Sequence, residues 1–416
     1  MNRIILIGNG FDLAHRLPTS YGNFIDWYWN EWLKKLMACV GYSISDELCK
    51  FSLQEKNNIW MGYLYNKISR LNPPKGRDFL DFLKGNSNVE ISKCPFLNNI
   101  CQSIDTKGWV DIENEYYNLL VSSSNNDNIA LNHQILNNQL KCLQDYLVEY
   151  LKRISIDAVN IIPNIKNIIS SPINPQDISV SEKEQIISHA KYWINCSDID
   201  FDNKIRNYNV SGIDSSAHSY YRIRREKFDL ENIYKNYSTF FLPDHILMLN
   251  FNYTSTANKY AQENKSIIEV NHIHGELSNP DSVIFGYGDE LDENYKKLSN
   301  LNDNEYLKNF KSIKYLESDR YRKALQFMDA APYQVFIMGH SCGNSDRTFL
   351  NTLFEHKNCV SIKPYYYKFP KGDDYFKIVQ NISRNFTDMK LMRDRVVNKT
   401  YCEPFSIKVP STISKE

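Results

Sequence analysis

Short runs of consecutive apolar residues near both ends of the chain predict strands that are buried on both faces of a sheet. The first run, 3–7 (Arg-Ile-Ile-Leu-Ile), ends at Gly8, and a helix is expected over 12–17. Later strands are predicted at 245–251, 267–270, 282–285, 334–338 and 359–367, separated by helical stretches at 254–264, 317–330, 345–356 and 373–386. Strands that alternate with helices through short connections indicate a parallel, doubly wound sheet.

The middle of the chain has a different period. Between about 45 and 235, apolar residues recur at spacings of three and four, as in the leucines at 136, 140, 143 and 147, which is typical of amphipathic helices. Segments 70–108, 122–130 and 170–183 are rich in Asn, Ser, Pro and Lys and are predicted to be loops. We therefore predict an α/β protein with a Rossmann-like doubly wound parallel sheet formed by 1–40 and 240–416. Residues 41–239 form a large helical insertion in this prediction.

Charge and cysteine content narrow the class of protein. Lys plus Arg and Asp plus Glu are equal, at 49 each, so no global field favours nucleic acid or an anionic membrane. The nine cysteines form no Cys-x-x-Cys pair, which favours reduced thiols and predicts no metal site. The apolar run at 4–7 is too short for a signal-peptide core, and no apolar stretch is long enough to span a membrane. We expect a cytoplasmic protein, and a homo-oligomer is compatible with these features.

The first motif is Gly8-Asn9-Gly10 at the end of the first predicted strand. Glycines there let backbone N–H groups approach a phosphate, and the start of a helix adds a favourable partial positive charge. The third glycine of the dinucleotide fingerprint is missing, so a tight turn that needs glycine is the alternative. Asp12 follows as a helix cap or a ribose contact.

The second motif, 249–254, carries Asn252 and Thr254 at the carboxyl end of a predicted strand. Ligands of open α/β sheets bind at these ends, and an Asn carboxamide can hold a water or a ribose hydroxyl. Capping of the next helix is the alternative for both residues.

The third motif, 271–275, places His272 and His274 on the same face of a strand that ends at Gly275. No partner at zinc-ligand spacing follows, so a general base is favoured over a metal site, with a buried core histidine as the alternative.

The fourth motif joins Gly339, Ser341 and Asp346 after another predicted strand. The spacing Gly339-x-Ser341-x-Gly343 formally matches a hydrolase nucleophile elbow. That fold would need an acid and then a histidine after the serine, and only His356, inside a predicted helix, follows.

Taken together, these motifs resemble the AbiH family of bacteriophage abortive-infection proteins. The resemblance spans almost the whole chain and is carried by 7–15, 18–21, 109–113, 249–254, 272–275, 339–341 and Asp346. It implies a role in phage defence, with a phage-derived trigger.

The AbiH pattern in turn resembles, more distantly, the sirtuin-like NAD-binding domains of antiphage effectors. That resemblance implies binding of NAD and cleavage of its nicotinamide–ribose bond, with Asn252 positioning water or ribose and His274 as base. Gly8, Asn9, Gly10, Asp12, Thr254, Gly339, Ser341 and Asp346 are then expected to bind the nucleotide. The sirtuin-like motif usually carries an acid where Thr254 stands, and the zinc-binding cysteines of true sirtuins are absent, which argues against protein deacetylation.

Two alternatives remain open at this stage. A non-catalytic nucleotide sensor would use the same loops, while a nuclease would need clustered carboxylates, for which Asp111 and Glu113 are the candidates. Trp109 and Glu113 stand four residues apart on a predicted helix and so share a face. We expect Glu113 to turn toward the nucleotide pocket at the sheet ends, whereas a carboxylate exposed to solvent is the alternative.

Overall fold

The chain divides into two compact units, each formed by separate stretches of sequence. A computed structural model describes residues 1–38, 43–53, 89–107, 110–124, 132–208, 228–262 and 264–405. The first unit comprises Met1–Leu17, Ser155–Ile284 and Lys314–Glu416, and the second comprises Pro18–Ile154 and Phe285–Ile313. Each unit is described separately below.

The first unit is built on a parallel sheet of five strands in the order β6-β5-β1-β7-β8. The strands are β1 (Asn2–Ile7), β5 (Ile246–Asn250), β6 (Ile268–His272), β7 (Tyr333–Met338) and β8 (Cys359–Tyr365). All six residues of β1 are buried, because this strand has a neighbour on each edge and helices against both faces. β1 therefore occupies the centre of the sheet.

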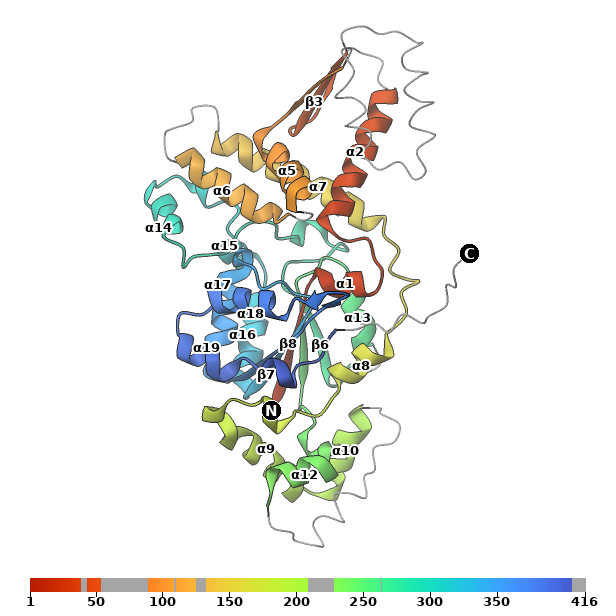
Figure 1. Ribbon diagram of the computed structural model, residues 1–416, viewed down its shortest axis with the longest axis vertical. Helices are drawn as coiled ribbons and strands as arrows, with labels where there is room; N and C mark the ends of the chain where they lie inside the picture. The colour runs from red at the N-terminus through yellow and green to blue at the C-terminus, as the bar shows by residue number, and fades with distance from the viewer. Residues whose placement is uncertain are drawn as a thin grey trace. The chain divides into compact units, whose positions relative to one another are not determined.

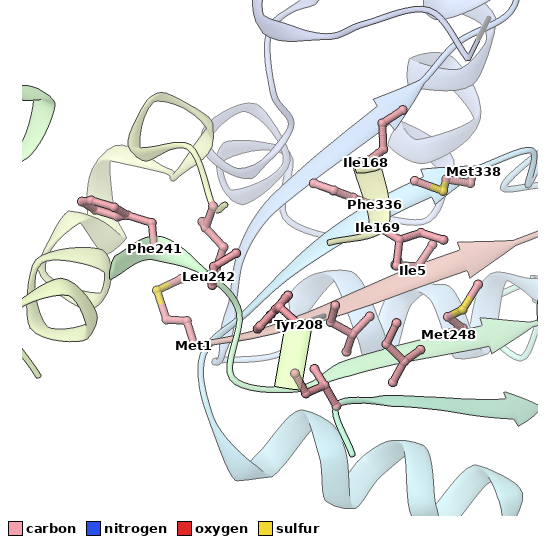
Figure 2. Packing of buried hydrophobic residues seen from close by; sticks show 14 of the residues in the cluster. Met1, Ile5, Ile168, Ile169, Tyr208, Phe241, Leu242, Met248, Phe336 and Met338 are labelled. Carbon is pink, nitrogen blue, oxygen red and sulfur yellow. The ribbon is translucent and has the colours of Figure 1, made fainter. Parts of the chain in front are cut away.

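Alternate side chains of β1 enter two different hydrophobic cores. Ile5 and Ile7 pack with α1, α8–α10, α12 and α13 on one face, whereas Ile4 and Leu6 pack with α16–α19 on the other. Figure 1 shows α16–α19 on one side of the sheet and α8 and α13 on the other, and Figure 2 shows part of the first core. These helices are α1 (Asn9–Ala14), α8 (Pro163–Ile169), α9 (Lys183–Asn195), α10 (Asp198–Tyr208), α12 (Leu230–Asn236), α13 (Thr256–Ala261), α16 (Arg320–Ala330), α17 (Arg347–Glu355), α18 (Tyr375–Arg384) and α19 (Met389–Arg395). A short hairpin, β9 (Lys368–Phe369) and β10 (Gly372–Asp373), precedes α18.

The second unit is mainly helical and carries a small antiparallel sheet. Its core joins the aromatic face of α2, including Phe24 and Trp27, to Tyr146 and Tyr150 of α7. The elements are α2 (Tyr21–Ala38), β2 (Ser43–Ser45), β3 (Cys49–Leu53), β4 (Val89–Lys93), α5 (Pro95–Lys107), α6 (Ile112–Ser124), α7 (His133–Lys152) and α14 (Glu293–Asn300), while α15 (Lys311–Lys314) spans the boundary with the first unit.

The mixed α/β class and the parallel sheet are as the sequence predicts, but several boundaries differ. Residues 282–285 form no strand: Pro280 opens a 3-10 turn, and the Ile284 nitrogen donates to the His274 carbonyl. Within 70–108, the described part contains β4 and α5 rather than loop alone. The described residues of 155–239 belong to the unit of the sheet, because the apolar faces of α8, α9, α10 and α12 share a core with Ile5.

Candidate functional site

The carboxyl ends of four parallel strands meet at one edge of the sheet. Ile7 pairs with Asn250 on one side and with Met338 on the other, and Asn250 pairs with His272. The segments that follow these strands contain every predicted site residue of the first unit. The parallel register of the strands therefore brings these motifs, which are distant in the sequence, to one edge of the sheet.

The loops after β1 and β7 pack backbone against backbone. The Gly10 nitrogen donates to the Gly339 carbonyl at 2.9 Å. A Cβ at Gly8 would lie 2.5 Å from the His340 Cα, and one at Gly10 would lie 2.7 Å from the Gly339 Cα. Gly339 has a φ of +74°, which alanine adopts only with strain. These glycines are required by the contact between the two loops, whether or not a phosphate binds there.

Asn252 fastens the segment after β5 to the glycine loop. Its Nδ2 donates to the Gly8 carbonyl at 3.0 Å, and its backbone nitrogen donates to Asn250 Oδ1 at 3.1 Å. Asn9, the first residue of α1, is exposed. The structure thus brings Asn252 and the glycine loop together, as a shared site requires.

Asp12 and Thr254 form a buried pair beside this loop. The Thr254 hydroxyl donates to Asp12 Oδ2 at 2.5 Å, and Asp12 is only 1% exposed. Within the described part of the chain, Asp12 Oδ1 has no hydrogen-bond partner. Burial raises the pKa of Asp12 to about 6, against smaller opposing contributions from Thr254, Thr256 and Asn252. A buried carboxyl of this kind weakens the fold at neutral pH, which is more common at functional sites than elsewhere.

Replacing Asp12 with asparagine is expected to stabilise the protein above pH 6. The folded-state pKa of Asp12, about 6, exceeds the ordinary value of 3.8, so the folded state keeps this proton at a pH where the unfolded state has lost it. The contribution of the Asp12 carboxyl to the free energy of unfolding is fully present below about pH 4 and is lost as the pH rises to 6. The loss is about 3 kcal/mol.

Urea unfolding at pH 4 and pH 7.5 measures this effect. The gain in Asp12→Asn should appear only at the higher pH, while the exposed Asp329→Asn control should show no such difference. A gain that is equal at both pH values would contradict the assignment.

His272 and His274, predicted to share a face, have different surroundings. Asn250 Nδ2 donates to His272 Nδ1 at 3.2 Å, and His272 Nε2 lies 2.9 Å from Asn258 Oδ1. Burial lowers the pKa of His272. Both ring nitrogens of His272 are therefore engaged in holding β6 against β5 and α13, which is a structural role.

His274 is buried among aromatic side chains and the carboxylate of Asp346. Its Nε2 is 3.1 Å from the Tyr315 hydroxyl and 3.2 Å from Asp346 Oδ1, and the residue is 4% exposed. The Phe251 ring packs against both His274 and His340, with ring centroids 5.0 and 4.2 Å apart. The structure thus joins two predicted site residues, His274 and Asp346, which come from segments after different strands.

Ser341 stands apart from this cluster. The residue is exposed, and its carbonyl accepts a hydrogen bond from Asn381 Nδ2 at 2.8 Å. Among the residues that the structure describes, no hydrogen bond joins the Ser341 hydroxyl to a histidine. The geometry therefore lacks the serine–histidine contact that the hydrolase alternative requires.

Glu113 lies in the second unit, in the first turn of α6. It is buried, and Oε2 lies 2.8 Å from Lys311 Nζ while Oε1 accepts from the Gly286 nitrogen at 3.1 Å. The alternative of a carboxylate exposed to solvent is therefore excluded. Trp109, expected on the same face, lies outside the described residues. The predicted place of Glu113 at the sheet ends stays a prediction.

Sequence reasoning missed three members of the site, namely Asn250, Tyr315 and His340. Asn250 and His340 stand inside motifs already singled out, and their position at strand ends was the available signal. Tyr315 belongs to a 3-10 turn before α16 and to no recognisable motif.

The comparisons with known proteins agree with the predicted family. The model of the family described as "Bacteriophage abortive infection AbiH" matches residues 4–367, which include all four carboxyl-end motifs. The chain therefore belongs to this family, and membership suggests an antiphage, abortive-infection role. No curated protein and no solved structure gives a significant match.

The described residues also bear on metal binding and on membrane insertion. No group of three or more His, Cys, Asp or Glu side chains there is arranged to hold a metal ion. None of the helices in that part of the chain is both long and apolar enough to cross a membrane.

Proposed function

We propose that this AbiH-family protein acts in phage defence by binding NAD at the carboxyl edge of the sheet and hydrolysing its nicotinamide–ribose bond. Numbered along the chain, the five strands lie in the order 3-2-1-4-5, which is shared by Rossmann-like nucleotide-binding sheets. Ligands of such sheets bind where the strand order reverses, here between the loops after β1 and β7. Those are the loops of Gly8, Gly10 and Gly339.

The observation that carries the catalytic proposal is the contact of His274 with Asp346. A histidine oriented by a carboxylate is a common general base, since the carboxylate stabilises the imidazolium that forms. In the proposed step, water attacks the anomeric carbon of the nicotinamide ribose and His274 takes a proton from that water. The electron pair of the broken bond goes to the pyridinium nitrogen, so nicotinamide leaves as a neutral molecule and ADP-ribose remains.

Asn252 has the role of positioning in this proposal. Its amide is held over the first loop by the Gly8 carbonyl, so the side chain can orient a ribose hydroxyl or the attacking water without adding charge. Cleavage through an oxocarbenium-like state depends largely on such placement.

Purified protein incubated with NAD, with or without phage extract, tests the proposal through nicotinamide release. His274→Ala and Asn252→Ala should each lower turnover by roughly 10²-fold or more while NAD binding, measured by calorimetry, changes little. The matched control is His356→Ala, which removes a histidine that contacts Asp329 on the surface of the same unit. Full activity in His274→Ala would rule out the mechanism.

A non-catalytic nucleotide sensor is the second candidate. It is favoured by the deep burial of His274 and by the hydrogen bond that already occupies the Asn252 amide. Under this alternative, calorimetry detects NAD binding, but no nicotinamide is released even with the phage trigger present.

A further inference from the structure

The loop after β7 carries a carboxylate that faces two histidines from different strands. Asp346 Oδ1 lies 3.2 Å from His274 Nε2, and Asp346 Oδ2 lies 3.5 Å from His340 Nε2. Asp346 is the N-cap residue of α17, yet its side chain makes no capping hydrogen bond. The side chain is therefore directed to the histidines instead of the helix, which is the usual partner of an aspartate at this position.

The proton of His340 can be assigned from its contacts. The Cys342 nitrogen donates to His340 Nδ1 at 3.0 Å, so Nδ1 carries a lone pair and the ring proton is on Nε2. Asp346 Oδ2 is the acidic oxygen near this Nε2–H, 3.5 Å from the nitrogen. Protonation of His340 at Nδ1 would break its hydrogen bond with Cys342, so His340 is unsuited to act as a base.

The same logic assigns the proton of His274. His274 Nε2 has two polar neighbours: Asp346 Oδ1, which as an ionised carboxylate oxygen can only accept, and the Tyr315 hydroxyl, which can accept as well as donate, so a proton on Nε2 suits both contacts. The basic lone pair of His274 is then on Nδ1. The Tyr315 hydroxyl, 3.1 Å from Nε2, limits rotation of the ring.

We propose that Asp346 and His340 are positioning residues that fix His274 as its Nε2–H tautomer and so make Nδ1 the catalytic base. This inference rests on the proposed hydrolysis for its kinetic consequence. The backbone on both sides of His340 has an unusual conformation, since Gly339 and Cys342 have φ of +74° and +53°. The Cys342 carbonyl accepts a hydrogen bond from Asn385 Nδ2 at 2.9 Å, which holds this segment in place. Cys342 has a left-handed conformation, which is uncommon for a residue other than glycine.

The tautomers can be measured without any activity. Two-bond ¹H–¹⁵N correlation spectra of the full chain with labelled histidine, assigned with His274→Gln and His340→Gln, should show protonated Nε2 in both residues of the wild type. Asp346→Asn has only one acceptor oxygen at this site, so it cannot accept from both histidines, and we expect at least His274 to lose its single tautomer. The surface variant Asp329→Asn, which alters another Asp–His contact of the unit, should leave the His274 signals unchanged.

Turnover supplies the second readout. Asp346→Asn should lower kcat by about 10³- to 10⁴-fold with little change in KM, the scale seen when the orienting carboxylate of a catalytic histidine is neutralised. His340→Gln keeps an N–H near Asp346 and should retain most activity and the His274 tautomer, whereas His340→Ala should lose both.

The two proposals fail in different ways. Protonated Nδ1 of His274 in the wild type, or an unchanged His274 tautomer in a folded Asp346→Asn, would overturn this inference. A wild type with the expected tautomers that releases no nicotinamide would instead overturn the proposed function. If Asp346→Asn does not fold, the wild-type spectrum and the comparison of His340→Gln with His340→Ala still decide the question.

Discussion

Gly339→Ala is expected to lower the free energy of unfolding by about 2–5 kcal/mol. The residue has a φ of +74°, which costs alanine roughly 1–2 kcal/mol. A Cβ there would also overlap the Phe11 nitrogen and lie 2.5 Å from the Gly10 carbonyl carbon, so the two loops would have to separate. Overpacking of this kind adds about 1–3 kcal/mol. Denaturant unfolding measures the loss, and NAD binding should weaken with it.

A matched variant, Gly372→Ala, separates the cost of backbone strain from the cost of a steric clash. Gly372 has a φ of +116°, but a Cβ at this position would have no neighbouring atom within 4 Å. Gly372→Ala should therefore show the backbone cost alone. Equal losses in the two variants would mean that loop packing contributes nothing at Gly339. A larger residue at Gly10 would disturb the same packing, because a Cβ there would lie 2.7 Å from the Gly339 Cα.

Asp177→Ala is expected to destabilise the first unit by about 3–5 kcal/mol. Asp177 is 5% exposed, and its Oδ2 lies 3.0 Å from Lys363 Nζ. Burial raises the pKa of Asp177, and Lys363 opposes that rise. Fully buried Arg3 is in the same core, where it donates to the Ser171 carbonyl at 2.7 Å and to Gln334. Loss of this carboxylate would remove the ion-pair partner of Lys363 and a negative charge that favours the charged form of Arg3.

Two further variants test whether charge is the cause. Adding Lys363→Met to Asp177→Ala should recover part of the stability, because a buried ion pair can be replaced by apolar groups at little cost. Asp319→Ala, which removes an exposed pair with Lys323, should change stability by less than about 1 kcal/mol. If Asp177→Ala costs no more than Asp319→Ala, the charge balance in this core is unimportant.

Strands β1, β5 and β7 of the parallel sheet could be predicted because each is mainly a run of apolar residues that leads into a glycine or an asparagine. Arg3–Ile7 and Gln334–Met338 both lie within observed strands, since burial on two faces leaves no polar alternation to interpret. The four motifs after these strands were found for the same reason. A parallel sheet places the carboxyl ends of its strands at one edge, so predicting the strands is enough to place the motifs that follow them near one another.

Contacts between distant segments could not be predicted from local patterns. Tyr315 stands in a turn without a motif, and its place beside His274 depends on the packing of α16 against the sheet. Residues 282–285 were predicted as a strand, but Ile284 packs in the core of the first unit and none of the four residues lies in a strand. Similarly, the spacing of apolar residues predicts helices in the region of α8 and α9, but it does not show against which hydrophobic core these helices pack.

The central place of β1 in the sheet also determines when the site can form during synthesis. β1 is made first, but its two neighbours, β5 and β7, emerge from the ribosome only after more than half of the chain and then a further segment have been translated. The hydrogen bond between Asn252 and Gly8 closes a loop of 244 residues. Contacts this distant in sequence make folding slow. A nascent chain that stops before β7 lacks the loop of Gly339 and Asp346, so it cannot hold an assembled site.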